Sequence, residues 1–197
     1  MRQVERVRFA CVFVVLVVLC GVTEGGVIEF NDKDRWIAAV GTFTTIGFDG
    51  FEPSTIITDQ FANLGILFTD GDDRIKPFDE ITFPNDGWGL DGNGNITLVF
   101  DTPQVWIAAD FPGRLQIQLF ANGELLYMSG IFGVGGFGNF GGLVSSEPFD
   151  TAVLMDFPAD FEAEIDDLHF GVPAPGVLWM LTVAMLYATP RARPTGR

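Results

Sequence analysis

Two short acidic turns contain residue types that can hold a cation. The segment Asp91-Gly-Asn93-Gly-Asn95 places three oxygen-bearing side chains at alternate positions, as a calcium-binding loop does. A full EF-hand loop also needs glycine at its sixth position and an acid at its twelfth, where this chain has Ile96 and Thr102. The pattern therefore favours a hydrated turn over an EF-hand. The second turn, Asp70-Gly-Asp72-Asp73, has the same interpretation.

A third acidic group precedes His169, the single histidine of the chain. We expect a strand over Ala163–Phe170, on which the adjacent side chains of Asp166 and Asp167 point to opposite faces. The two carboxylates then cannot share one site symmetrically, and charges on an edge strand that prevent unwanted pairing explain them simply. His169 lies among residues that alternate between core and surface, which indicates a structural or solvent-facing role rather than a catalytic one.

Signatures of catalysis are weak. Gly133-Val-Gly135-Gly-Phe-Gly138 matches a dinucleotide fingerprint, but that motif works only between a strand and a helix, and no helical pattern follows it. A sandwich loop is the better interpretation. Neither a Gly-x-Ser-x-Gly elbow nor a His-Glu-x-x-His helix occurs. We predict that the chain is not an enzyme; a glycosidase-type hydrolase with paired carboxylates is the alternative.

One aromatic side chain is a candidate for ligand binding. Trp88 lies in the polar, glycine-containing segment Asn85-Asp-Gly-Trp-Gly89, where an exposed ring can stack on a sugar. We therefore expect carbohydrate as the ligand class and Trp88 as its contact residue.

The elements that must position these residues are short strands. One helix is expected over Asn31–Val40, with Asn31 as its cap and with Trp36, Ile37 and Val40 on one face. Runs of β-branched and aromatic residues bounded by turn residues then predict strands: Thr44–Phe48, Gly65–Thr69, Ile96–Phe100, Val105–Asp110, Leu115–Phe120, Glu124–Met128, Thr151–Asp156 and Ala163–Phe170. This spacing predicts an all-β fold, an antiparallel β-sandwich.

The N-terminal segment, residues 1–25, has the order of a secretory signal peptide. Three arginines precede the apolar run Phe9–Val22, and small residues offer cleavage sites after Thr23 or Gly25. An uncleaved membrane anchor is the alternative. Both cysteines, Cys11 and Cys20, fall in this leader, so the domain over residues 26–171 must be held by its core alone.

Charge excludes several partners. Five of the 11 Lys and Arg residues and 24 of the 26 acids lie within residues 26–175, which gives that span a net charge of −19. Such a surface repels nucleic acid and anionic lipid. The 20 phenylalanines supply enough apolar surface for a folded core despite this charge.

The C-terminal segment, residues 172–197, begins with a Pro-x-Pro motif, continues as an apolar run and ends in a basic tail. The residues concerned are Val172, Pro173, Ala174, Pro175, Arg191, Arg193 and Arg197. The apolar stretch from Gly176 to Thr189 spans about 21 Å as a helix, against a hydrocarbon core of about 30 Å. It is therefore short for a permanent membrane anchor, and a buried terminal helix is the alternative.

Five segments of the chain resemble exported bacterial β-sandwich proteins that carry a PEP-CTERM sorting signal: Phe30–Gly41, Ile46–Phe48, Thr58–Phe68, Phe140–Ser145 and Ile165–Gly171. The tail is similar to that signal, a Pro-Glu-Pro motif before an apolar helix and arginines, with Ala174 in the glutamate position. The resemblance implies a jelly-roll-like sandwich, export to the cell surface or beyond, and processing by an exosortase-like enzyme. In jelly-roll modules the first and last strands often hold a structural calcium ion, which implies Glu29 and Asp166 or Asp167 as ligands here.

Together these observations predict an exported, non-catalytic protein of the cell surface or extracellular matrix. Its expected partners are the processing enzyme, an extracellular polysaccharide, and the membrane through the C-terminal segment.

Overall fold

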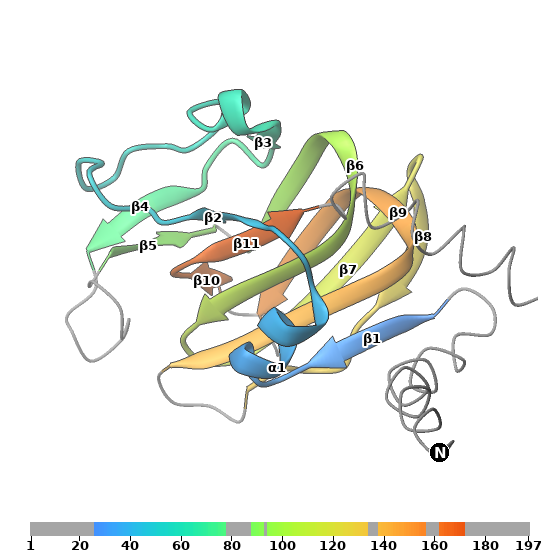
Figure 1. The fold of residues 1–197 in the computed structure, drawn as a ribbon. Helices are drawn as coiled ribbons and strands as arrows, with labels where there is room; N and C mark the ends of the chain where they lie inside the picture. Colours follow the sequence, from blue (N-terminus) through green and yellow to red (C-terminus); the bar gives the residue numbers. More distant parts are fainter. Residues whose placement is uncertain (1–25, 78–87, 93, 134–137, 157–161, 172–197) are drawn as a thin grey trace, which may run out of the picture.

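The computed structural model describes residues 26–77, 88–92, 94–133, 138–156 and 162–171 (Figure 1). Antiparallel strands and one short α-helix dominate these residues, which confirms the predicted all-β class and the N-terminal helix. The predicted signal peptide and the C-terminal sorting segment lie outside the described residues. No helix among the residues described is both long enough and apolar enough to cross a membrane.

The elements follow the chain in this order: β1 (Val27–Phe30), α1 (Lys33–Ala39), β2 (Thr44–Ile46), η1 (Ala62–Leu64), β3 (Ile66–Phe68), β4 (Arg74–Pro77), β5 (Trp88–Asp91), β6 (Asn95–Phe111), β7 (Leu115–Ala121), β8 (Glu124–Met128), β9 (Asn139–Asp156), β10 (Glu164–Ile165) and β11 (Leu168–Gly171). An eight-stranded sheet has the order β2-β11-β6-β9-β7-β8, with β1 paired to β9 and β3 paired to β6. The strands β10, β5 and β4 form a second, three-stranded sheet.

Two long strands, β6 and β9, pair along their whole length and bend together. Their register shifts between Val99 and Gln104 and again before Trp106, and exposed prolines, Pro103 and Pro148, lie at the bend of each strand. Proline cannot donate a ladder hydrogen bond and is tolerated at such an irregularity. The bend folds the sheet into two halves (Figure 1). One half contains β2, β11 and β1; the other contains β3, β7 and β8.

The main core lies between the two halves. Alternate residues of β6 and β7 are buried, as the clean alternation of Leu115–Phe120 predicts. Phe100, on the first half of β6, contacts Phe170 of β11 at 5.3 Å and Phe149 of β9 at 5.9 Å between ring centroids. These contacts tie the two halves into one apolar cluster, as in a β-sandwich.

Several predicted elements need correction. The single strand predicted over Ala163–Phe170 is wrong, because β10 pairs with β5 in the small sheet whereas β11 pairs with β2 and β6 in the large one. Asp166 and Asp167 form the bend between these two sheets, so they are not neighbours on a regular strand. The strands β1, β4 and β5 and the first half of β9 were not predicted, because these segments are short or rich in glycine and charge.

Helix α1 begins one residue later than predicted. Asp32, rather than Asn31, is the N-cap, and its carboxylate accepts a hydrogen bond of 2.9 Å from the backbone N–H of Arg35. Trp36 is fully buried, but Ile37 is 41 % exposed and does not share its face. A second apolar cluster therefore forms on the outer side of the sheet, where Trp36 packs with Trp106, Ala108 and Phe140.

Candidate functional site: a buried histidine network and the hollow beside it

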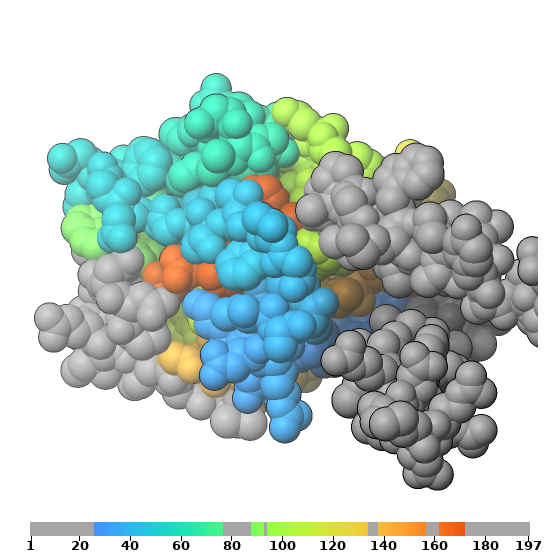
Figure 2. Space-filling model, in the orientation of Figure 1, coloured from blue at the N-terminus to red at the C-terminus, as the bar shows by residue number. Residues whose placement is uncertain are grey.

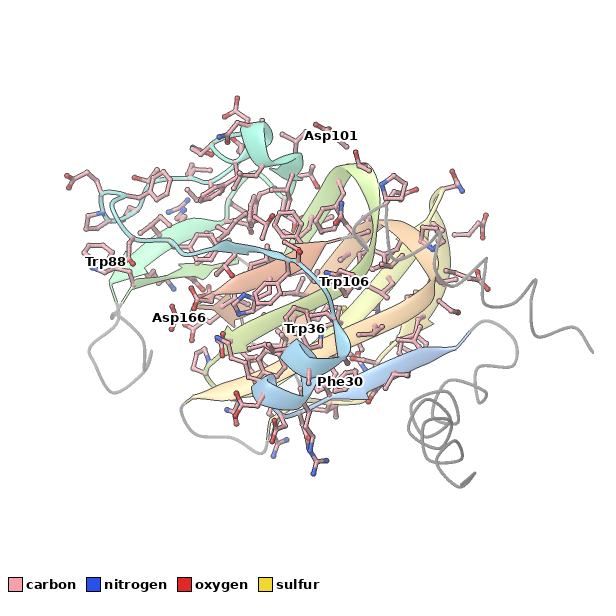
Figure 3. The ribbon with its side chains drawn as sticks, in the orientation of Figure 1. Phe30, Trp36, Trp88, Asp101, Trp106 and Asp166 are labelled. Carbon is pink, nitrogen blue, oxygen red and sulfur yellow. The ribbon has the colours of Figure 1, made fainter. Side chains whose placement is uncertain are left out.

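Strand register assembles a polar network under helix α1. Thr45 of β2, His169 of β11 and Ala108 of β6 are directly opposite one another across three neighbouring strands. Side chains two residues apart on a strand point the same way, so Asp110 lies on the same face as Ala108. That face is the outer one, which α1 covers (Figures 1 and 3).

His169 uses both of its ring nitrogens. Its Nδ1 lies 2.9 Å from the Thr45 hydroxyl, and its Nε2 lies 2.9 Å from Oδ2 of Asp110. The ammonium group of Lys33 donates to the same Oδ2 at 2.6 Å. An ionised carboxylate can only accept, so Nε2 carries a proton, while the hydroxyl can satisfy Nδ1 in either protonation state of the ring.

Aromatic side chains enclose the histidine. His169 is 2 % exposed, and the ring centroids of Phe43, Trp36 and Phe140 lie 5.6, 5.8 and 6.5 Å from its own. In Figure 2 the orange strand β11 is visible only in gaps between the blue segments that lie over it. The network is therefore sheltered on its helix side.

The electrostatics of Asp110 favour its charged form. Burial on its own raises the pKa of this carboxyl, but the hydrogen bonds and charges of His169 and Lys33 outweigh burial and hold the pKa below its ordinary value. The network is thus a compensated charge cluster: one anion accepts from a lysine and from a histidine.

The order hydroxyl, imidazole, carboxylate also occurs in nucleophilic catalysis. Thr45 is exposed and its hydroxyl contacts a ring that a carboxylate orients. In acyl transfer the base must also pass its proton to the leaving group, which requires access to substrate. The enclosed ring of His169 lacks such access, so the arrangement is better suited to tying β2, β11, β6 and α1 together.

The same cluster satisfies one geometric requirement of a metal site, the closeness of its ligand atoms. Ligand atoms of Asp110, Asp167 and His169 lie within 4.8 Å of one another. However, a metal ion would compete with the Lys33 ammonium for Asp110 and with the existing partners of the imidazole. Calcium also prefers oxygen ligands, so a histidine nitrogen makes this a poor calcium site.

The structure does not bring together the three residues considered as calcium ligands. Glu29 of β1 accepts hydrogen bonds from the Tyr127 hydroxyl at 2.9 Å and from the backbone N–H of Gly130 at 2.7 Å. When the pairing is followed from Glu29 across β9 and β6 to β11, the residue in register on β11 is Phe170. It is three strand spacings, or about 14 Å, from Glu29. Asp166 and Asp167 precede Phe170 by four and three residues, at the β10–β11 bend.

The two aspartates are instead fixed against β6. The backbone N–H of Asp166 donates to the Asp110 carbonyl at 2.8 Å, and the N–H of Asp110 donates to the Asp167 carbonyl at 2.9 Å. Asp166 is fully buried, and its position below the small sheet is visible in Figure 3. This pairing positions Asp167 beside the histidine network.

Trp88, which the sequence predicts as a sugar contact, is half-buried. It lies on β5 at the edge of the molecule (Figure 3), opposite Pro77, and its half-buried ring packs against the main core. The predicted sorting residues from Val172 to Pro175 and the tail arginines lie outside the described residues.

A polar hollow adjoins the histidine network and was not predicted from the sequence. It has a volume of about 500 Å³ and lies between the β1–α1 turn and the adjoining ends of β6 and β9. The side chains that give it its character are those of Asn31, Asp32, Lys33, Asp34, Asp110 and Asn139. The polar run from Asn31 to Asp34 is the signal for this hollow in the sequence, where it predicts only the start of a helix.

Comparison with known proteins finds no matching family model, no similar curated protein and no similar solved structure.

Proposed function

We propose that the chain is an exported, non-catalytic protein of the cell surface or extracellular matrix that binds carbohydrate. The observation that carries this proposal is the polar hollow beside α1, in which carboxylate, amide and ammonium groups converge. The volume of about 500 Å³ falls within the usual range for small-ligand sites. The all-β fold supports a jelly-roll-like sandwich, and we include this architecture in the proposal.

The chemistry of the hollow suits sugar hydroxyl groups. Asp32 and Asp34 offer acceptors, Lys33 offers donors, and the amide of Asn31 offers both. Asp110 adds a carboxylate whose orientation is already fixed by Lys33 and His169. A preorganised acceptor loses less conformational freedom when a ligand binds.

A glycan array followed by calorimetry on the purified full-length protein tests this proposal. We expect binding without turnover, weakened at least tenfold by Asn31→Ala combined with Asp34→Ala, two exposed positions in the hollow. Glu124→Ala combined with Asp101→Ala is the matched control on exposed residues outside the hollow lining. Loss of binding in Trp88→Ala but not in the hollow variant would move the site to β5, and release of shortened chains would contradict a non-catalytic role.

Sorting by an exosortase-like enzyme is the second part of the proposal. It is supported by the order of the Pro-x-Pro motif, the apolar run and the arginines after Val172. The intact mass of the protein from its native cell tests it. A mass that lacks both the leader and the residues after the motif is expected; retention of Arg197 would contradict cleavage of the tail.

A hydrolase is the second candidate function, and one observation favours it. Glu164 of β10 is directly opposite Asp91 of β5, and burial, followed by the charge of Asp91, raises the pKa of Glu164 to about 7. A protonated acid beside a second carboxyl group is the pair that glycosidases use. Cleavage of a bound polysaccharide that disappears in Glu164→Gln would favour this candidate over the binding module.

A further inference from the structure

A buried donor on the outer face of the large sheet has no acceptor in the described part of the chain. Trp106 of β6 is 6 % exposed, and its indole Nε1 is buried without a hydrogen bond to any residue that the structure describes. A buried N–H that has lost water without gaining an acceptor is unfavourable, so buried tryptophans normally find a partner. The acceptor for this N–H is therefore expected outside the described residues.

The indole lies between the α1–β2 connection and the end of β11 (Figure 3). Its six-membered ring contacts Gly41, where an added Cβ atom would lie 3.6 Å from Cη2. Its Nε1 faces Gly171, where an added Cβ atom would lie only 2.6 Å from that nitrogen. The unpartnered N–H is therefore directly beside the last described residue of β11.

Strand register brings the following residues close to the same nitrogen. Gly171 pairs with Trp106, so one further step in register would place Val172 opposite Val105. Pro173 has no N–H for a ladder hydrogen bond, and β6 changes register at this point. The chain therefore leaves the ladder within two residues of Gly171, which is about 8 Å of chain at most.

The chemistry of the next four residues suits an indole donor. Residues 172–175 read Val-Pro-Ala-Pro, and such a segment favours the polyproline II conformation, in which backbone carbonyl groups are free to accept. Aromatic grooves recognise segments of this kind because the segments lose little conformational freedom on docking. Val40 and Phe43 pack beside Trp106 in the outer apolar cluster and can contact the proline rings.

We propose that residues 172–175 dock against Trp106, with one of their backbone carbonyl groups accepting a hydrogen bond from the indole N–H. The docked Pro-x-Pro motif is held on the folded domain, so an enzyme reaches this part of the tail only after the contact opens. The contact depends neither on carbohydrate binding nor on cleavage of the tail. Trp106 is not among the described residues that line the hollow.

The N-terminal leader is less well placed to supply the acceptor. It precedes β1, and β9 lies between β1 and β6. The leader therefore enters the sheet two strand spacings, or about 10 Å, from the strand that carries Trp106. The tail instead continues from the residue that faces Nε1.

Hydrogen exchange at the Trp106 indole, measured by NMR on the ¹⁵N-labelled full-length protein, tests the donor. The spectrum of Trp106→Phe identifies its signal. The tail variant combines Val172→Gly, Pro173→Gly, Ala174→Gly and Pro175→Gly, and its greater backbone freedom favours release. We expect its indole hydrogen to exchange at least fivefold faster than in the parent, because exchange requires the hydrogen bond to open.

A matched tail control changes only residues beyond the motif. Arg191→Gln, Arg193→Gln and Arg197→Gln together are expected to leave the exchange rate of the Trp106 indole at the parental value. Neither tail variant alters a described residue, so both test the contact without a change in the core.

Limited proteolysis with a protease of broad specificity tests the acceptor. Trp106→Phe keeps an aromatic ring and removes the N–H, and we expect cleavage within residues 172–189 to become at least threefold faster. Trp88→Phe, on β5, is the matched control and keeps the parental cleavage rate.

Three results would overturn the proposal. The first is parental indole exchange in the tail variant, as expected if an ordered water satisfies the N–H. The second is parental cleavage of the tail in Trp106→Phe. The third is an indole exchange rate that rises only when residues 1–25 are removed, which would assign the acceptor to the leader.

Discussion

Two aspartates in this molecule, one fully buried and one partly buried, have opposite electrostatic environments. Asp110, under helix α1, lies against the ammonium group of Lys33 and the imidazole of His169, and its pKa is lowered. Asp73, at the start of β4, lies among other acids, and burial followed by their charges raises its pKa to about 7. Burial acts in the same direction on both carboxyl groups. The neighbouring cations therefore decide which of them stays charged.

The two aspartates therefore contribute to the protein in different ways. The Asp110 cluster completes its own charge balance and holds four segments of the chain together. The Asp73 carboxyl has no neighbouring cation among the described residues, and its raised pKa of about 7 means that a proton neutralises it. The first cluster is thus suited to stabilising the fold, and the second to sensing the solution outside it.

The largest effect is expected from breaking the balanced cluster. Asp110→Ala leaves a buried imidazole and an ammonium group without their anion, which we expect to lower the free energy of unfolding by about 4 kcal/mol. Urea denaturation measures this loss. Asp101→Ala, at an exposed position, is the matched control and is expected to change stability by less than about 0.5 kcal/mol. An equally small effect at Asp110 would show that the cluster does not stabilise the fold.

The second prediction uses pH to isolate the contribution of Asp73 to the free energy of unfolding. Its folded pKa lies above its unfolded pKa, so the folded state binds more protons between these values and stability falls as pH rises toward 7. Between pH 5 and pH 8, Asp73 is expected to reduce the free energy of unfolding by on the order of 3 kcal/mol.

Glu164 acts in the same direction, because its folded pKa is also about 7. The Asp73 contribution is therefore read from the difference between the parent and Asp73→Asn in denaturation curves at several pH values. Parallel pH profiles for the two proteins would show that Asp73 is not a buried titrating group.

The smallest effect concerns the outer end of the balanced cluster. Thr45→Val removes the hydroxyl at Nδ1 of His169 with little change in shape. We expect it to lower the free energy of unfolding by about 1 kcal/mol. Thr45→Ser keeps the hydroxyl and is the matched variant, expected to remain close to the parent. Thermal unfolding of the three proteins compares them directly. Destabilisation by Thr45→Ser but not by Thr45→Val would indicate that the methyl group, not the hydrogen bond, matters.

The sequence predicts the fold class better than it predicts these sites. The alternation in Leu115–Phe120 and the turn before Glu124 are local patterns, and β7 and β8 occur where they predict. The division of Ala163–Phe170 between two sheets depends on which strands lie alongside, which no local pattern reports. The same limit explains why Ile96–Phe100 and Val105–Asp110, predicted as two strands, are the two halves of the single strand β6, which bends near Pro103.

The candidate sites depend on contacts between distant segments. The chain separates Lys33, Asp110 and His169 by more than fifty residues at each step, so their meeting follows from strand register rather than from motif spacing. The resemblance to jelly-roll modules groups Glu29 with Asp166 and Asp167, but β1 pairs with β9, and β6 separates β9 from β11. The acidic turn at Asp70–Asp73 was visible in the sequence, but its burial was not.

The bend shared by β6 and β9 has a consequence for how the chain acquires its fold. Each of these strands contributes to both halves of the sheet, so neither half can form from one contiguous part of the chain. Asn95 pairs with Met155, and Ile46 pairs with Leu168 near the end of the described residues. Contacts between such distant residues make folding slow, on a timescale of milliseconds to seconds for proteins of this kind. A chain emerging from a ribosome or a membrane pore would therefore remain unfolded until residue 171 had passed through.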